Sequence, residues 1–188
     1  MKKIVICGTL GLDEKTQYQM TDEEHAKYLR FQEVLEQLQI LKKLLPWEIV
    51  NKIQSIGDKR TYILTIRESF NNMVYTYSNC VYNLLEIFLP KRIAREEANK
   101  IYKISEVNKI IEPKKGIRQL DVHISSKNRY YTWAYFGTTS GIDNNTKLSY
   151  LKRTRKECID EMNNIYRKII HFSRNILKKI DKEIGKRH

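Results

Sequence analysis

The feature that most constrains the fold is a run of apolar residues at helical spacing between residues 63 and 88. Its members recur every three or four positions, which places them on one face of an α-helix. They are Ile63, Ile66, Phe70, Met73, Val74, Tyr77, Val81, Leu84, Leu85 and Phe88. The run ends just before Pro90, and proline cannot continue a helical hydrogen-bond ladder. We therefore predict a central core helix that follows Asp58 and ends before this proline.

The N-terminal third of the chain has a helix-start signal followed by an apolar stripe. Thr21 and Glu24 form a capping box, in which the hydroxyl and the carboxylate each bind an exposed backbone amide. A helix is therefore expected to begin there and to continue until Pro46 interrupts it. Its stripe consists of Tyr28, Phe31, Leu35, Leu38, Leu41 and Leu45. A shorter helix is expected from Trp47 to Gly57.

The second half of the chain contains two more helical patterns. One runs from Ile93 to about Ile111 and stops at Pro113, because the residue before a proline disfavours helical geometry. The other runs from about Lys147 to Ile184 and is the longest helix that the sequence predicts. The inner side of this last helix is apolar, and its opposite side is heavily basic.

Together these patterns predict an all-α fold, a helical bundle of four to five long amphipathic helices in a single domain spanning residues 1–188. Residues 1–20 are expected to form an N-terminal extension, with a short extended segment at Lys3–Cys7. Residues 113–146 are expected to be irregular, since they contain Gly137, Gly141 and a run of polar residues. Loops carry functional residues more often than packed stripes do, so we expect the functional site in residues 113–146.

The charge of the chain favours a polyanionic partner. The 35 Lys and Arg residues outnumber the 22 Asp and Glu residues, which gives a formal net charge of +13 and a positive field over much of the surface. Nucleic acid is favoured over a membrane because no segment combines a cationic face with an uninterrupted apolar one. The alternative is that the charge reflects a proteome rich in Lys and Ile.

The cysteines and the termini indicate a protein of a reducing compartment. Cys7, Cys80 and Cys158 are odd in number and far apart, without the C-x-x-C spacing of a zinc site, so neither a disulfide framework nor a structural metal is expected. No cofactor motif is recognised either. No stretch has the length of a signal-peptide core or a membrane span. We therefore expect a cytoplasmic location.

The pattern that carries chemistry is the pair Arg118 and His123, which are separated by four residues. An imidazole has a reference pKa of about 6.5 and can therefore transfer protons near neutral pH. A guanidinium is permanently charged, binds phosphate oxygens through two parallel donors, and stabilises developing charge. These two residue types suit RNA cleavage by the neighbouring 2′-hydroxyl. On one ideal helix they would lie about 140° apart, so one motif alone does not build a site.

The R-x4-H spacing in a small, basic, all-helical chain resembles the HEPN superfamily, which includes metal-independent endoribonucleases of toxin, abortive-infection and CRISPR systems. The resemblance covers the hexapeptide from Arg118 to His123 and the general architecture. It implies a homodimer, in which motifs from two chains line one cleft. It also implies cleavage of single-stranded RNA to a 2′,3′-cyclic phosphate and a 5′-hydroxyl, and the possibility of an antitoxin or regulatory protein as a partner.

Several further residues are candidates for RNA binding. Gln119 lies inside the motif, and Lys127 and Arg129 precede Tyr130 in an aromatic-rich run. Such aromatic residues can stack on unpaired bases while the cations hold phosphates, although core packing also explains them. Arg167 and His171 are four positions apart on the last helix and face the same way. They can contact phosphate, or they can be an ordinary helix-surface pair or, for His171, a histidine packed in the core.

Two functions from different classes therefore follow from the sequence. The first is a HEPN-like endoribonuclease of a defence or toxin system, with Arg118 and His123 catalytic. The second is a non-catalytic basic helical protein that binds nucleic acid or an acidic protein partner, in which these two residues are structural.

Overall fold

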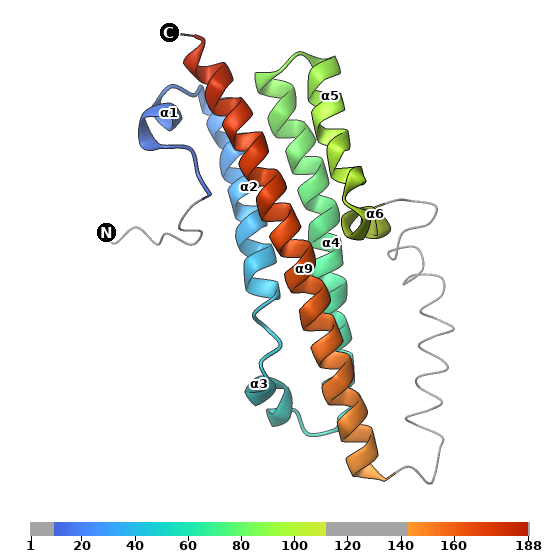
Figure 1. Ribbon diagram of the computed structural model, residues 1–188. Helices are drawn as coiled ribbons and strands as arrows, with labels where there is room; N and C mark the ends of the chain where they lie inside the picture. The colour runs from blue at the N-terminus through green and yellow to red at the C-terminus, as the bar shows by residue number, and fades with distance from the viewer. Residues whose placement is uncertain (1–9, 112–142, 188) are drawn as a thin grey trace.

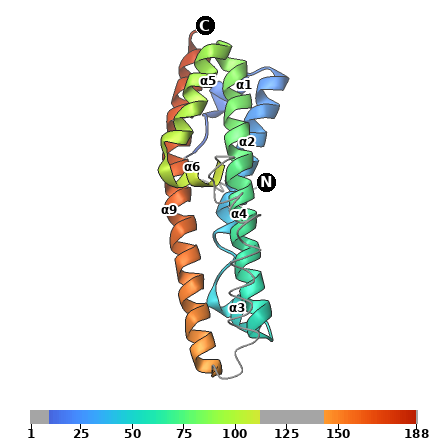
Figure 2. The same cartoon turned by 90° about the vertical axis from the view of Figure 1, so that its right-hand side faces the viewer.

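The computed structural model describes residues 10–111 and 143–187, and every regular element in these two ranges is helical. This confirms the all-α prediction. The long helices are α2 (Asp22–Leu41), α4 (Ile56–Phe88) and α9 (Asn144–Gly185). They lie side by side as an elongated bundle, as Figures 1 and 2 show. The short extended segment expected at Lys3–Cys7 lies outside the described residues.

The central helix is α4, as its apolar period predicts. It packs against α2 and α9 as well as against α5 (Lys91–Asn99) and α6 (Ser105–Ile111). Ser55 caps its first turn by accepting a hydrogen bond from the Asp58 amide at 3.0 Å. The helix consequently begins at Ile56, three residues before the predicted start after Asp58, because a serine hydroxyl binds the exposed amides of a first turn.

The capping box predicted for α2 is present. The Thr21 amide donates to the Glu24 carboxylate at 2.9 Å, and the Glu24 amide donates to the Thr21 hydroxyl at 3.3 Å. The helix ends at Leu41, four residues before the end of its predicted stripe. The carbonyls of Leu44 and Leu45 instead accept hydrogen bonds from side chains of α4 and α9, which remove the need for a further helical turn.

One of the shorter predicted helices ends earlier in the structure than the sequence indicates. The helix expected from Trp47 to Gly57 is confined to α3 (Trp47–Lys52). Its last carbonyls lie near the buried ammonium of Lys59, which donates to the carbonyl oxygens of Asn51 and Ile53. A charged donor from the next helix thus satisfies groups that would otherwise continue the ladder.

The prediction of one continuous helix from residue 93 to residue 111 is wrong. The structure divides this stretch into α5, a 3₁₀ turn η1 (Lys100–Lys103) and α6, with Ile104 extended at φ −83° and ψ 101°. The break turns α6 across α4 and buries Val107, Ile110 and Ile111. Tertiary burial outweighs local helical periodicity here.

The last helix is close to its prediction, and with 42 residues it is about 63 Å long at 1.5 Å per residue. Asp143 caps it by accepting hydrogen bonds from the amides of Asn145 and Thr146. A short helix, α1 (Glu14–Tyr18), rests against the other end of α9. Among the helices of the described ranges, none is long and apolar enough to cross a membrane.

Candidate nucleic-acid interface

The inner side of α9 holds the helix in the bundle and so decides which side faces solvent. Its buried residues recur every three or four positions and include Ile165, Ile169, Ile176 and Ile180. At the middle of this side the hydroxyls of Tyr77 and Ser173 lie 2.6 Å apart, with both side chains fully buried. Burial raises the pKa of Tyr77 above its usual value. The pair therefore stays uncharged and fixes the rotation of α9 against α4.

The middle of α9 is unusual in its charge. From Met162 to Ile180 the chain contains no Asp or Glu, but five Lys or Arg residues and His171. This stretch is about 27 Å long at helical rise. The cations are not equivalent: Lys168 and Lys179 bind carboxylates of neighbouring helices and are partly buried, whereas the side chains of the others are exposed.

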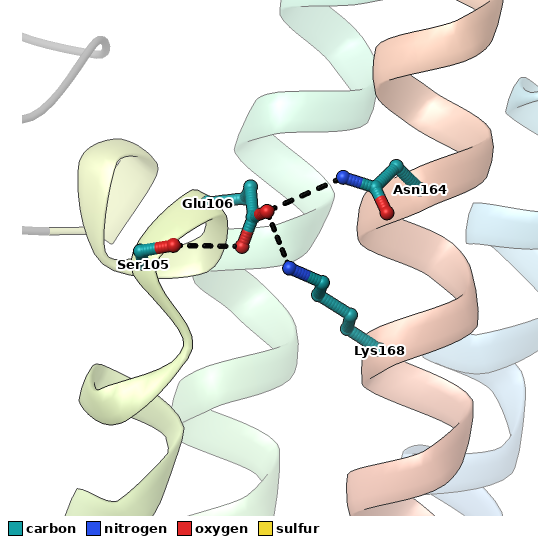
Figure 3. A network of polar contacts seen from close by, with 4 residues as sticks. All are labelled: Ser105, Glu106, Asn164 and Lys168. Atoms are coloured by element: carbon teal, nitrogen blue, oxygen red, sulfur yellow. Dashed lines mark hydrogen bonds and ion pairs between the residues drawn. The ribbon is translucent and has the colours of Figure 1, made fainter.

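Lys168 is one of the cations that a neighbouring helix neutralises. Its ammonium donates to the Glu106 carboxylate at the start of α6, which also accepts from the Asn164 amide at 3.3 Å and from the Ser105 hydroxyl at 2.9 Å, as Figure 3 shows. The bond from Lys168, followed by hydrogen bonds from the Glu106 amide and the Ser105 hydroxyl, lowers the pKa of Glu106 to about 2. Glu106 is thus a carboxylate at any physiological pH and fastens α6 to α9.

Lys179 is neutralised in the same way, three helical turns further along. The Glu97 carboxylate of α5 lies 3.0 Å from the ammonium of Lys179 and 2.6 Å from that of Lys100. Burial alone would raise the pKa of Glu97, but the two lysines outweigh it and lower that pKa. The α5–α6 stretch is therefore bound to α9 at two points, and both use inward-facing cations.

The remaining basic side chains of this part of α9, together with Lys182 just beyond it, point away from the bundle. All five are exposed, and spacings of three and four place them within a sector of about 80°. We call them the outer row: Arg167, His171, Arg174, Lys178 and Lys182. It extends over about 22 Å. The outer row presents a nearly linear series of hydrogen-bond donors of positive or neutral charge to solvent.

A hollow of about 340 Å³ lies beside the outer row, between the Leu10–Asp13 segment and α9. Two acids line it, and both already accept hydrogen bonds. Asp13 caps α1 by accepting from the Thr16 amide at 2.7 Å, and this bond lowers the pKa of Asp13. Asp181 accepts from the Thr16 hydroxyl at 2.9 Å. Arg174 and Lys178 of the outer row complete the polar part of the wall.

The structure places two of the residues predicted from the sequence. Arg167 and His171 are both exposed on one face of α9, so the alternative of a core-packed His171 is excluded. Its apolar neighbours Ile169 and Phe172 point inward, because each residue turns the helix by about 100°. The other predicted residues lie outside the described part of the chain: Arg118, Gln119, His123, Lys127, Arg129 and Tyr130.

The sequence analysis did not identify the other members of the outer row. It also did not identify Glu97 and Glu106, the two carboxylates that bind Lys179 and Lys168 of α9. The signal for Lys178 and Lys182 was available, because they continue the three- and four-residue spacing of Arg167, His171 and Arg174. The pairing of Glu97 and Glu106 with α9 was not, since their lysine partners are more than sixty residues away in sequence.

In comparisons with known proteins, no family model matches this chain, and no curated protein or solved structure is significantly similar to it.

Proposed function

We propose that this chain is a HEPN-like, metal-independent endoribonuclease of a toxin or abortive-infection type defence system, in which Arg118 and His123 act on single-stranded RNA. The observation that carries the proposal is the R-x4-H spacing in a chain whose described fold is an all-α bundle. The outer row of α9 supports it, because an RNA-cleaving protein needs a cationic surface along which the RNA backbone can lie.

The proposed reaction is a transfer within the RNA. His123 takes the proton of a 2′-hydroxyl, whose oxygen attacks the adjacent phosphorus while the bond from phosphorus to the 5′-oxygen breaks. Arg118 binds the phosphate oxygens and stabilises the charge that develops there. A proton returned to the 5′-oxygen completes the step. The products are a 2′,3′-cyclic phosphate and a 5′-hydroxyl.

A homodimer is part of the proposal, because Arg118 and His123 of one motif do not share a narrow helical face. In a dimer, the arginine and histidine of two chains can meet across one cleft. A regulatory protein that restrains cleavage is the second partner proposed, since an unrestrained ribonuclease would damage the cell that makes it.

The test is cleavage of single-stranded RNA in EDTA by the wild-type protein and by His123→Ala and Arg118→Ala. We expect cleavage by the wild type, a loss of at least about 100-fold in each variant, and a 2′,3′-cyclic phosphate on the product. His25→Ala is the matched control, because this half-buried histidine of α2 has no part in the proposed reaction. Equal cleavage by His123→Ala and wild type, or none by either, would refute the nuclease proposal.

A second candidate function is favoured by the outer row itself. Its five exposed side chains require no catalytic partner to attract a polyanion. The chain would then be a non-catalytic binding protein for nucleic acid or an acidic protein, and Arg118 and His123 would be structural. Tight, salt-sensitive RNA binding without cleavage in the same assay would favour this candidate.

A further inference from the structure

We infer that the outer row of α9 is a binding site for the phosphate backbone of a single nucleic-acid strand, read without regard to base sequence. The inference rests on the proposed function only for the choice of RNA as the polymer. The site itself follows from the two different surroundings of the α9 cations. Lys168 and Lys179 bind carboxylates of the bundle, whereas the side chains of the outer row are exposed.

The spacing of the outer row suits a chain of phosphates. Its members are about one helical turn apart, about 5.4 Å along the axis, and their spacings of three and four place them on one side of the helix. This helix, α9, runs unbroken along the bundle (Figure 1). Arginine and lysine bind phosphate oxygens directly, and an imidazole N–H can donate to a phosphate in either protonation state. Arg167, His171, Lys178 and Lys182 can therefore contact several phosphates of one strand, with a wider interval of about 10.5 Å between His171 and Lys178.

The surroundings of the outer row favour a nucleic acid over an acidic protein. A protein interface usually has large apolar or aromatic anchors at its centre. Eight large hydrophobic residues are exposed in the described parts of the chain, and none of them lies between Leu151 and Gly185 of α9. On α1, which packs against the end of α9, Tyr18 is exposed, and a single tyrosine is a small apolar surface for a protein interface. Nucleic-acid interfaces are instead polar and strongly positive. The outer row has this second character.

Base-specific recognition is not expected at this site. The outer row consists of cations and a histidine, with no Phe, Tyr or Trp among them. Stacking of a base on the His171 ring or on a guanidinium plane does not distinguish one base from another. Affinity should therefore depend on the number of phosphates and on salt, with little dependence on base composition.

The test measures binding of a fluorescent single-stranded RNA whose 2′-positions are all methylated. This probe lacks the 2′-hydroxyl nucleophile, so binding is measured whether or not the protein cleaves ordinary RNA. The variant is Arg167→Gln with Lys178→Gln, two exposed positions at which the change leaves the buried side of α9 intact. The matched control is Arg95→Gln with Lys103→Gln, which removes the same charge from exposed positions of α5 and η1. Circular dichroism verifies that all three proteins are folded.

Each lost contact should reduce the slope of log affinity against log salt by about 0.7, so the outer-row variant should lose about 1.4 in slope. If the non-electrostatic part of binding is unchanged, this corresponds to an affinity about 25-fold lower at 0.1 M salt. The control should lose only a few-fold. A single-stranded DNA of the same sequence should behave as the methylated RNA does.

Two results would overturn the inference. One is an equal loss of affinity in the control and the outer-row variant, because binding would then follow the overall charge of the protein. The other is unchanged RNA binding in the outer-row variant together with a lost affinity for a polyglutamate peptide, which would assign this face to an acidic protein. The failure of the nuclease proposal would look different, since ordinary RNA would stay intact while the outer row still bound the methylated probe.

Discussion

The buried hydroxyl pair between α4 and α9 allows a quantitative prediction. Tyr77 and Ser173 are fully buried, and their oxygens lie 2.6 Å apart. Removing one partner strands the other, which costs about 1–3 kcal/mol, whereas removing both can be nearly neutral. The Ile169 carbonyl lies 3.5 Å from the Tyr77 hydroxyl and belongs to the residue four before Ser173 on α9, so it can accept a hydrogen bond from whichever hydroxyl remains. We therefore expect the lower half of this range, about 1–2 kcal/mol, for Tyr77→Phe and for Ser173→Ala.

The assay is thermal and urea unfolding of both single variants and of the double variant. For a domain of this size the single variants should lower Tm by about 2–8 °C, because 1 kcal/mol corresponds to about 2–4 °C. The double variant should be no less stable than the worse single variant, which gives a coupling energy of at least about 1 kcal/mol. Tyr82→Phe on the same helix is the control, since its hydroxyl binds Glu86 at the exposed surface. Strict additivity of the two changes would refute this account of how α9 is fixed.

Three other perturbations test the contacts that shape the bundle. A carboxyl with a folded-state pKa of about 2 stabilises the fold fully above its ordinary value of 4.5 and loses that contribution as the pH falls between the two. Glu106→Gln should therefore flatten the acid limb of a urea-stability profile, by at most about 1 kcal/mol because both Glu106 and Lys168 are partly exposed; an unchanged limb would contradict this. Thr21→Ala should cost about 1 kcal/mol by calorimetry, since it removes the cap of α2, and a neutral effect would show that the capping box is dispensable. Lys59→Met should cost about 1–3 kcal/mol in urea unfolding, because two backbone carbonyls lose a charged donor, and a more stable variant would contradict this.

The sequence predicted those parts of the fold that depend on local pattern. The apolar period from Ile63 to Phe88 yields α4, and the capping box at Thr21 marks the start of α2, because both signals act within a few turns of helix. The break at Ile104 could not be predicted in this way. No proline or glycine marks it, and its cause is the burial of α6 against distant residues.

In the candidate site, too, the features set by local spacing were predictable and those set by distant residues were not. The shared face of Arg167 and His171 follows from a spacing of four on any helix, so the sequence was sufficient to predict it. Their exposure was not predictable from flanking residues, since His171 is followed by the buried Phe172. The inward roles of Lys168 and Lys179 depend on carboxylates that only the folded chain brings near.

The helix that carries the outer row is braced by three neighbours at the same level. Lys42 at the end of α2 binds Asn163, Arg67 of α4 binds Glu161, and α6 is fastened at Lys168. Because α9 is one unbroken helix from Asn144 to Gly185, the intervals between the outward cations are set before any ligand binds. Binding of a polyanion there would order side chains of α9 but no backbone. The entropic cost of binding on the protein side would therefore be small. A nucleic-acid strand bound along α9 would therefore be held in an extended conformation by cations at fixed intervals.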